Sequence, residues 1–120
     1  MNIKIADAEL EVMRILWREK RPLKVSEFRD ELKDLKGWTK STVHTLVIRL
    51  RDKGLIETTE SYGVARYIPT ISEDEFVLAE AQATLEKLGG AKSLALAMVK
   101  SGHLTDADID ELREYLEGKR

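Results

Sequence analysis

Residues 38–69 read WTKSTVHTLVIRLRDKGLIETTESYGVARYIP and contain the clearest structural signals of the chain. A helix capped by Thr39 should end at Gly54, because a threonine can accept the first backbone amides and a glycine can close the last turn. Its buried stripe is expected from apolar residues three or four positions apart: Val43, Leu46, Val47 and Leu50. Two short segments rich in β-branched and aromatic residues follow, at 55–60 and 64–69, around a glycine turn. The order predicts a helix and then a β-hairpin.

Two more amphipathic helices precede this stretch. The first is expected to begin with Asp7 as its N-cap and to end near Lys20. The second should span about 25–36, carry Leu35 on its apolar stripe and stop at Gly37. Three helices followed by a hairpin are the order of a winged helix-turn-helix, which we predict for residues 1–70.

Three further helices are expected in residues 71–120. A capping box at 72–75 opens the first, the apolar run LALAMV at 94–99 marks the second, and Thr105 can cap the third. Fifty residues in such helices cannot bury their many leucines alone, so pairing with a second copy is expected. The residues predicted to form this dimerisation region are Leu78, Leu85, Leu88, Leu94, Met98, Ile109, Leu112 and Leu116. The predicted fold class is therefore mainly α with a small β-hairpin, a winged helix-turn-helix followed by a helical dimerisation domain.

Charge is divided unevenly between the two halves. The whole chain has a formal net charge of -2, but residues 1–70 hold 14 Lys and Arg against 11 Asp and Glu, whereas residues 71–120 hold 6 against 11. A mildly basic front half is compatible with a nucleic-acid partner, and phosphate would repel the acidic back half. The sequence therefore places any nucleic-acid contact in residues 1–70.

The outward face of the third helix has the chemistry of a DNA-reading helix. Short polar side chains near its start would let the backbone enter the major groove, and longer cationic ones could reach bases or phosphates. Arg66, on the hairpin, is the candidate for a contact from the wing to the backbone or minor groove. The predicted DNA-binding residues are Lys40, Ser41, Thr42, His44, Thr45, Arg49, Arg51 and Arg66.

Other classes of function lack support in the composition. The chain has no cysteine and only two distant histidines, so neither a metal site nor a cofactor is predicted. No cluster of nucleophile, base and orienting group can be assembled, which argues against an enzyme. The chain shows neither a run of 18 apolar residues nor the blocks of a secretory signal at its start, so we expect a cytoplasmic protein without a membrane partner.

The motifs resemble those of the penicillinase repressor family, the group of the β-lactamase, methicillin-resistance and copper-homeostasis repressors. The similarity lies in AELEVMRILW, in WTKSTVHTLVIRLRDKGLI, in a wing that ends RYIP, in GGAKSLALAMV and in LTDADIDELREYLE, and so spans nearly the whole chain. It implies a homodimeric transcriptional repressor that occupies an inverted-repeat operator in double-stranded DNA.

The resemblance also implies routes of induction, and the chain departs from both. Antibiotic-responsive members lose activity when a regulatory protease pathway leads to a cut at an Asn-Phe pair in the dimerisation helices, but Ala97-Met98 stands at the corresponding position here. Copper-responsive members use a cysteine cluster, and this chain has no cysteine. The absence of cysteine excludes the copper route, and the absence of the Asn-Phe pair argues against a regulatory protease as a partner.

A winged-helix module that binds another protein is the alternative function. Such a module should present an aromatic or aliphatic anchor on its third helix. The outward positions here are Lys, Ser, His and Thr, which favour DNA.

Overall fold

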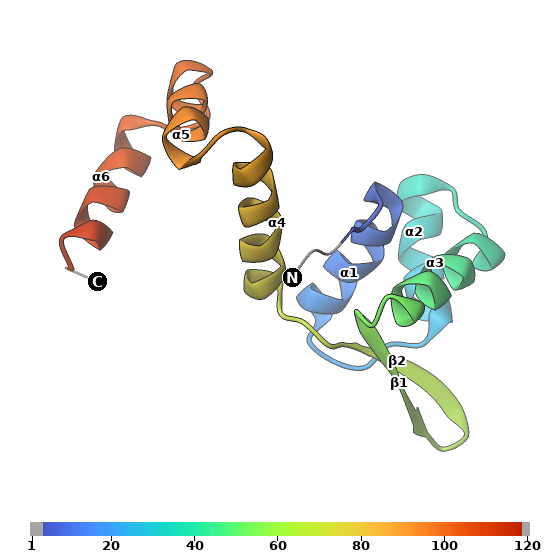
Figure 1. The fold of residues 1–120 in the computed structure, drawn as a ribbon. Coiled ribbons are helices and arrows are strands. Elements are labelled where there is room, and N and C mark those ends of the chain that lie inside the picture. Colours follow the sequence, from blue (N-terminus) through green and yellow to red (C-terminus); the bar gives the residue numbers. More distant parts are fainter. Residues whose placement is uncertain (1–3, 119–120) are drawn as a thin grey trace. The chain divides into compact units, whose positions relative to one another are not determined.

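The computed structural model describes residues 4–118 and divides the chain into two compact units, the first ending at Ala79 and the second beginning at Glu80. Figure 1 shows the order of the elements. The first unit holds α1 (Asp7–Glu19), α2 (Val25–Lys36), α3 (Lys40–Asp52), β1 (Ile56–Ser61), β2 (Val64–Pro69) and the start of α4 (Glu73–Lys87). The second holds the rest of α4, α5 (Ala91–Lys100) and α6 (Asp106–Leu116). This confirms the expected fold class, with a winged helix-turn-helix in the first unit.

The core of the first unit lies where α1, α2 and α3 meet. Each helix is amphipathic and turns one apolar stripe inward, which is the arrangement that removes most apolar surface from water. The fully buried side chains of these helices include Val12, Met13, Phe28, Leu32, Val43, Val47 and Leu50. Trp38, just before α3, packs against this cluster and is partly buried. The stripe predicted for α3, Val43, Leu46, Val47 and Leu50, is thus confirmed.

Helix boundaries follow from local capping. Thr39 accepts a hydrogen bond from the Thr42 amide at 3.2 Å, and Gly37 ends α2 in a left-handed conformation with φ 70°. The Thr105 hydroxyl caps α6 by accepting from the Asp108 amide at 3.2 Å. These three caps were predicted correctly from the sequence.

The N-cap expected at Asp7 is wrong. Ala6 has the extended backbone of an N-cap, and Asp7 is the first helical residue. Alanine has no side-chain acceptor, so the Glu9 carboxylate takes the capping role and accepts a hydrogen bond from the Ala6 amide at 2.8 Å.

The prediction that Leu35 belongs to the buried stripe of α2 is also wrong. It is 67% exposed, although it continues the apolar stripe of α2. Residues 33–37 are all exposed, so the last turn of α2 extends past the part of the helix that the core covers.

The hairpin is anchored to the helices at its base. β1 and β2 pair antiparallel from Ile56 opposite Pro69 to Ser61 opposite Val64. Tyr67 is buried and exchanges two backbone hydrogen bonds, 2.8 and 3.1 Å long, with Leu23 in the turn between α1 and α2. This bridge ties the wing to the three-helix core.

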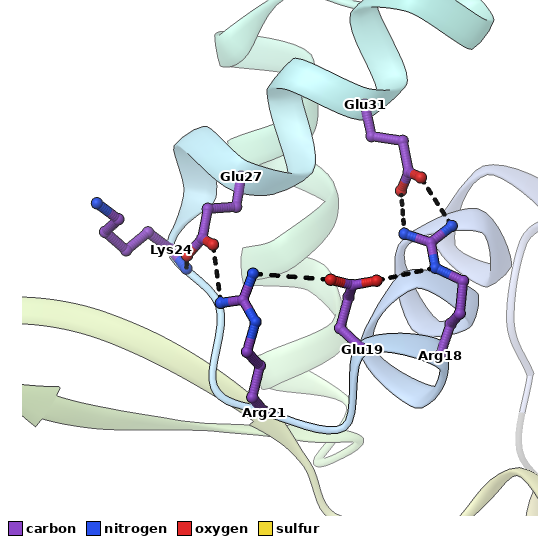
Figure 2. A network of polar contacts seen from close by, with 6 residues as sticks. All are labelled: Arg18, Glu19, Arg21, Lys24, Glu27 and Glu31. Carbon is purple, nitrogen blue, oxygen red and sulfur yellow. Dashed lines mark hydrogen bonds and ion pairs between the residues drawn. The ribbon is translucent and has the colours of Figure 1, made fainter.

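Ion pairs connect the end of α1 with α2, as Figure 2 shows. Arg18 lies 2.7 Å from Glu31 and 3.0 Å from Glu19, and Arg21 lies 2.8 Å from Glu27. The carboxylate of Glu27 also accepts from the Lys24 amide at 3.0 Å. The arginine side chains are more than half exposed, so solvent screens these pairs and each contributes little to stability.

The first unit extends beyond residue 70 because the chain after the wing packs against α1. Ile71 and Phe76 are buried. The Trp17 ring packs against the Phe76 ring at a tilt of 42° with centroids 5.3 Å apart, and its Nε1–H donates a hydrogen bond to the Ile71 carbonyl at 2.9 Å. The functional division into residues 1–70 and 71–120 stays a prediction.

Many apolar side chains of the second unit are exposed to solvent. Within the described residues 80–118, α5 and α6 contain no buried residue. Leu88, Leu112 and Leu116 are 49%, 52% and 85% exposed, and Leu78, near the end of the first unit, is 61% exposed. The other residues predicted for dimerisation are partly buried: Leu85, Leu94, Met98 and Ile109.

Candidate nucleic-acid interface

The candidate interface is built on α3. Val43, Val47 and Leu50 are fully buried and Leu46 is 5% exposed, so one side of this helix is fixed against the core. Leu55 follows Gly54 and is buried as well, and its amide donates to the Leu50 carbonyl at 3.0 Å. The opposite side of α3 is therefore held outward by packing.

Short polar side chains occupy that outward side. Ser41 and Thr45 lie one turn apart, and the Thr45 hydroxyl donates to the Ser41 carbonyl at 3.0 Å. Thr42 is exposed, and its hydroxyl shares a 3.2 Å hydrogen bond with the Thr39 hydroxyl, so its first role is in the cap. His44 is exposed on the same helix.

Cationic side chains mark both ends of α3. Lys40 is exposed in the first turn, and Arg49 and Arg51 are exposed in the last turn. Arg51 lies 3.8 Å from the exposed carboxylate of Asp52, a separation at which solvent leaves little interaction. The structure thus brings seven of the eight predicted residues onto the exposed surface of one helix.

The eighth residue, Arg66, lies on the wing. It is partly exposed on β2, directly opposite Thr59 of β1. Successive residues of a strand face opposite sides, so Arg66 points away from the side on which Tyr67 is buried. The helix and the hairpin follow one another in the chain, but Arg66 is not part of the α3 surface.

Two groups of residues were missed by the sequence analysis. Arg29 and Lys33 of α2 line a groove of about 320 Å3 together with Trp38, Thr39 and Lys40 at the start of α3. Their spacing of four residues places them on one face of α2, and this signal is present in the sequence.

Tyr62 is the second omission. It is fully exposed at the tip of the hairpin, with a positive φ of 54° that non-glycine residues seldom adopt. The turn was predicted, but the exposure of the ring was not.

A buried carboxylate lies beneath the end of α3. Glu9 is 1% exposed, and its Oε1 atom lies 2.6 Å from Lys53 Nζ. Burial raises the pKa of Glu9, but hydrogen bonds from Lys53 and the Ala6 amide, with the charges of Lys53 and Arg49, outweigh it and hold this pKa below its ordinary value. Glu9 is therefore ionised at neutral pH.

Metal binding and membrane insertion were also considered for the described part of the chain. Residues 4–118 contain no group of three or more His, Asp or Glu side chains placed to hold a metal ion. Across the same residues, no helix combines the length and apolar character needed to cross a lipid bilayer.

Comparison with known proteins places these features in a family. A model of the penicillinase repressor family matches residues 5–118. The penicillinase repressor of Staphylococcus aureus is 34% identical over 117 residues, which cover 96% of this chain and 92% of that protein. The methicillin resistance regulatory protein MecI of Staphylococcus aureus strain N315 is 30% identical over 118 residues, covering 97% and 95%.

A solved structure agrees with the architecture of the first unit. The structure of monomeric Bacillus licheniformis BlaI in complex with the blaP half-operator superposes with a TM-score of 0.54 at 32% identity, covering 62% of this chain and 90% of that one. The matched family consists of transcriptional repressors and not of enzymes. With a matching model over nearly its whole length, the chain belongs to the penicillinase repressor family.

Proposed function

We propose that the protein is a homodimeric, sequence-specific DNA-binding repressor of transcription that acts at an inverted-repeat operator in the cytoplasm. The observation that carries the proposal is the exposed polar face of α3, opposite a stripe that the core buries completely. The relatives support it, because they are repressors and one of them, BlaI, was solved with a half-operator.

The proposed contacts follow from side-chain chemistry. Thirteen helical residues make α3 about 20 Å long, and a helix of this kind fits the major groove, which is about 12 Å wide. Ser41 and Thr45 would face base edges, where hydroxyls can donate or accept and a threonine methyl can touch thymine. Lys40, Arg49 and Arg51 would contact phosphates or a guanine edge, and Arg66 would contact the backbone beside the wing.

The second unit supports the proposal of a homodimer. Leu104, Leu112 and Tyr115, with the acidic Asp108 and Glu111, line a mostly apolar groove of about 570 Å3. Leu96 and Val99 of α5 are 47% and 44% exposed. A second copy that covered these side chains would remove them from water, and it would supply a second reading helix for the other half of the operator.

We propose no regulatory protease as a partner, because α5 carries Ala97-Met98 at the position where the resemblance described above implies an Asn-Phe cleavage pair.

Binding to defined DNA tests the function. The purified protein should bind a promoter fragment that contains its inverted repeat at least about 10³-fold more tightly than random DNA of equal length. Equal retention on both fragments would refute sequence-specific repression.

Two variants separate the proposed roles. Ser41→Ala should change the preference among operator sequences, because it alters a base contact. Arg66→Ala should weaken binding to all sequences and reduce the salt slope by about 1, because it removes one phosphate contact. An unchanged salt slope for Arg66→Ala would remove the wing contact from the proposal.

A further inference from the structure

Glu9, near the start of the chain, holds the corner where α3 ends and the wing begins. Lys53 is the C-cap of α3. Its Nζ atom lies 2.6 Å from Glu9 Oε1, in the first turn of α1, and donates a second hydrogen bond to the Lys4 carbonyl at 2.9 Å. We call the Glu9 and Lys53 pair the clasp.

The same corner is held from its other side by the chain that leaves the wing. The Thr70 hydroxyl donates to the Gly54 carbonyl at 2.6 Å, and the Thr70 amide donates to the Leu55 carbonyl at 2.9 Å. Gly54 has a φ of 80°, so the turn relies on a backbone conformation that glycine adopts readily. Residues 53–55 are thus bonded both to the start of α1 and to the end of β2.

The clasp is a poor device for stability alone. Glu9 is 1% exposed, and in the described part of the chain its Oε2 atom is buried without a hydrogen-bond partner. Desolvating a carboxylate is costly, and an apolar side chain of similar size would fill the space at a lower cost. The Lys53 side chain is 39% exposed, so the buried partner is the Glu9 carboxylate, which loses its charged partner in any arrangement that moves Lys53 away.

We propose that Glu9 and Thr70 are positioning residues that fix the direction of the wing relative to α3, and thereby set operator affinity without touching DNA. This inference rests on the proposed function. Each arm of the wing has six residues and is about 20 Å long, so a change of about 10° at the corner moves the wing tip by about 3.5 Å. A hydrogen bond does not survive a displacement of that size.

Glu9→Gln and Thr70→Val test the inference in the full-length protein. Glu9→Gln keeps the shape but removes the charge that holds Lys53, and Thr70→Val keeps the shape but removes the hydroxyl that holds Gly54. Each should weaken binding to the operator about tenfold or more, with little change in binding to random DNA and no change in salt slope. Glu31→Gln is the matched control, because it breaks the 2.7 Å ion pair with Arg18 between α1 and α2 (Figure 2) and should leave the operator preference intact.

A double variant separates positioning from direct contact. If Lys53 matters only through the clasp, Glu9→Gln combined with Lys53→Met should bind the operator no more weakly than the worse single variant. If Glu9→Gln instead raises binding to random DNA and steepens the salt slope by about 1, the released Lys53 contacts phosphate and the inference is overturned.

A measurement without DNA distinguishes failure of this inference from failure of the proposed function. Residual dipolar couplings of backbone amides report the angle between α3 and the hairpin. The angle should change in Glu9→Gln and in Thr70→Val but not in Glu31→Gln, whether or not the protein prefers an operator. An unchanged angle in both variants would overturn the positioning role, whereas an absent operator preference in the wild type would overturn the function alone.

Discussion

Replacing Leu112 by glutamate tests whether a second copy covers α6. Leu112 is 52% exposed within the chain and lines the apolar groove next to Tyr115. In a monomer the new carboxylate would remain hydrated and only the half of the Leu112 side chain that is already buried would be lost, so the free energy of unfolding should fall by about 1 kcal/mol.

The cost in a dimer is much larger. Full burial of a leucine side chain contributes about 2 kcal/mol, so covering its exposed half contributes about 1 kcal/mol in each protomer. Desolvation of a carboxylate at the same place adds at least about 1 kcal/mol per protomer. Two protomers together give about 4 kcal/mol, which raises the dimer dissociation constant about 10³-fold.

Sedimentation equilibrium over a range of micromolar concentrations measures this constant. Arg113→Glu is the control, because it adds negative charge at a neighbouring side chain of α6 that is 66% exposed and does not line the groove. A wild type that is monomeric at these concentrations, or a Leu112→Glu variant that dissociates like the wild type, would contradict a dimer that covers α6.

Three further predictions concern the first unit. Thr39→Ala removes the acceptor of the Thr42 amide and should lower stability by about 1 kcal/mol in thermal unfolding, whereas Thr39→Ser should keep it; equal melting temperatures for all three proteins would contradict the cap. Leu50→Ala empties a fully buried position and should cost about 2–5 kcal/mol in urea unfolding; a loss below about 1 kcal/mol would mean that the α3 stripe is loosely packed. The pKa of Glu9 is held below its ordinary value, so its ionised form stabilises the fold above about pH 4.3, and this contribution is lost as the pH falls through the folded-state pKa. As the pH is lowered below about 4.3, the melting temperature of the wild type should therefore fall more steeply than that of Glu9→Gln, and parallel curves would count against the clasp.

The elements that the sequence predicted well are those specified by neighbouring residues. α3 is the best example, since Thr39, the apolar stripe and Gly54 all lie within one helix length. Capping and helical periodicity act over three or four residues, so they can be read without knowing the rest of the fold. The polar face of α3 followed directly from its buried stripe.

The errors have a common cause. Asp7 is a residue type that favours the N-cap position, but Ala6 occupies that position. The Glu9 carboxylate accepts from the Ala6 amide and also bonds to Lys53. Leu35 has the right spacing for the core, yet the neighbouring helices do not extend far enough to cover it. Both outcomes depend on which elements meet, and local patterns do not contain that information.

The candidate site was only partly predictable for the same reason. The basic residues of α3 were identified from one helix, whereas the groove that joins Lys33 of α2 to Lys40 of α3 requires the two helices to be packed together. Glu9 and Lys53 are 44 positions apart, and no periodicity relates them.

Propensity, capping and charge are properties of neighbouring residues, so the helices, the hairpin, the basic front half and the outward polar face of α3 follow from the amino-acid sequence. The burial of the Glu9 carboxylate against Lys53, and the hydrogen bonds of Thr70 at the same corner, arise only in the folded chain. Such contacts form when segments distant in the chain are brought within hydrogen-bonding distance, and packing of the whole core determines which segments meet.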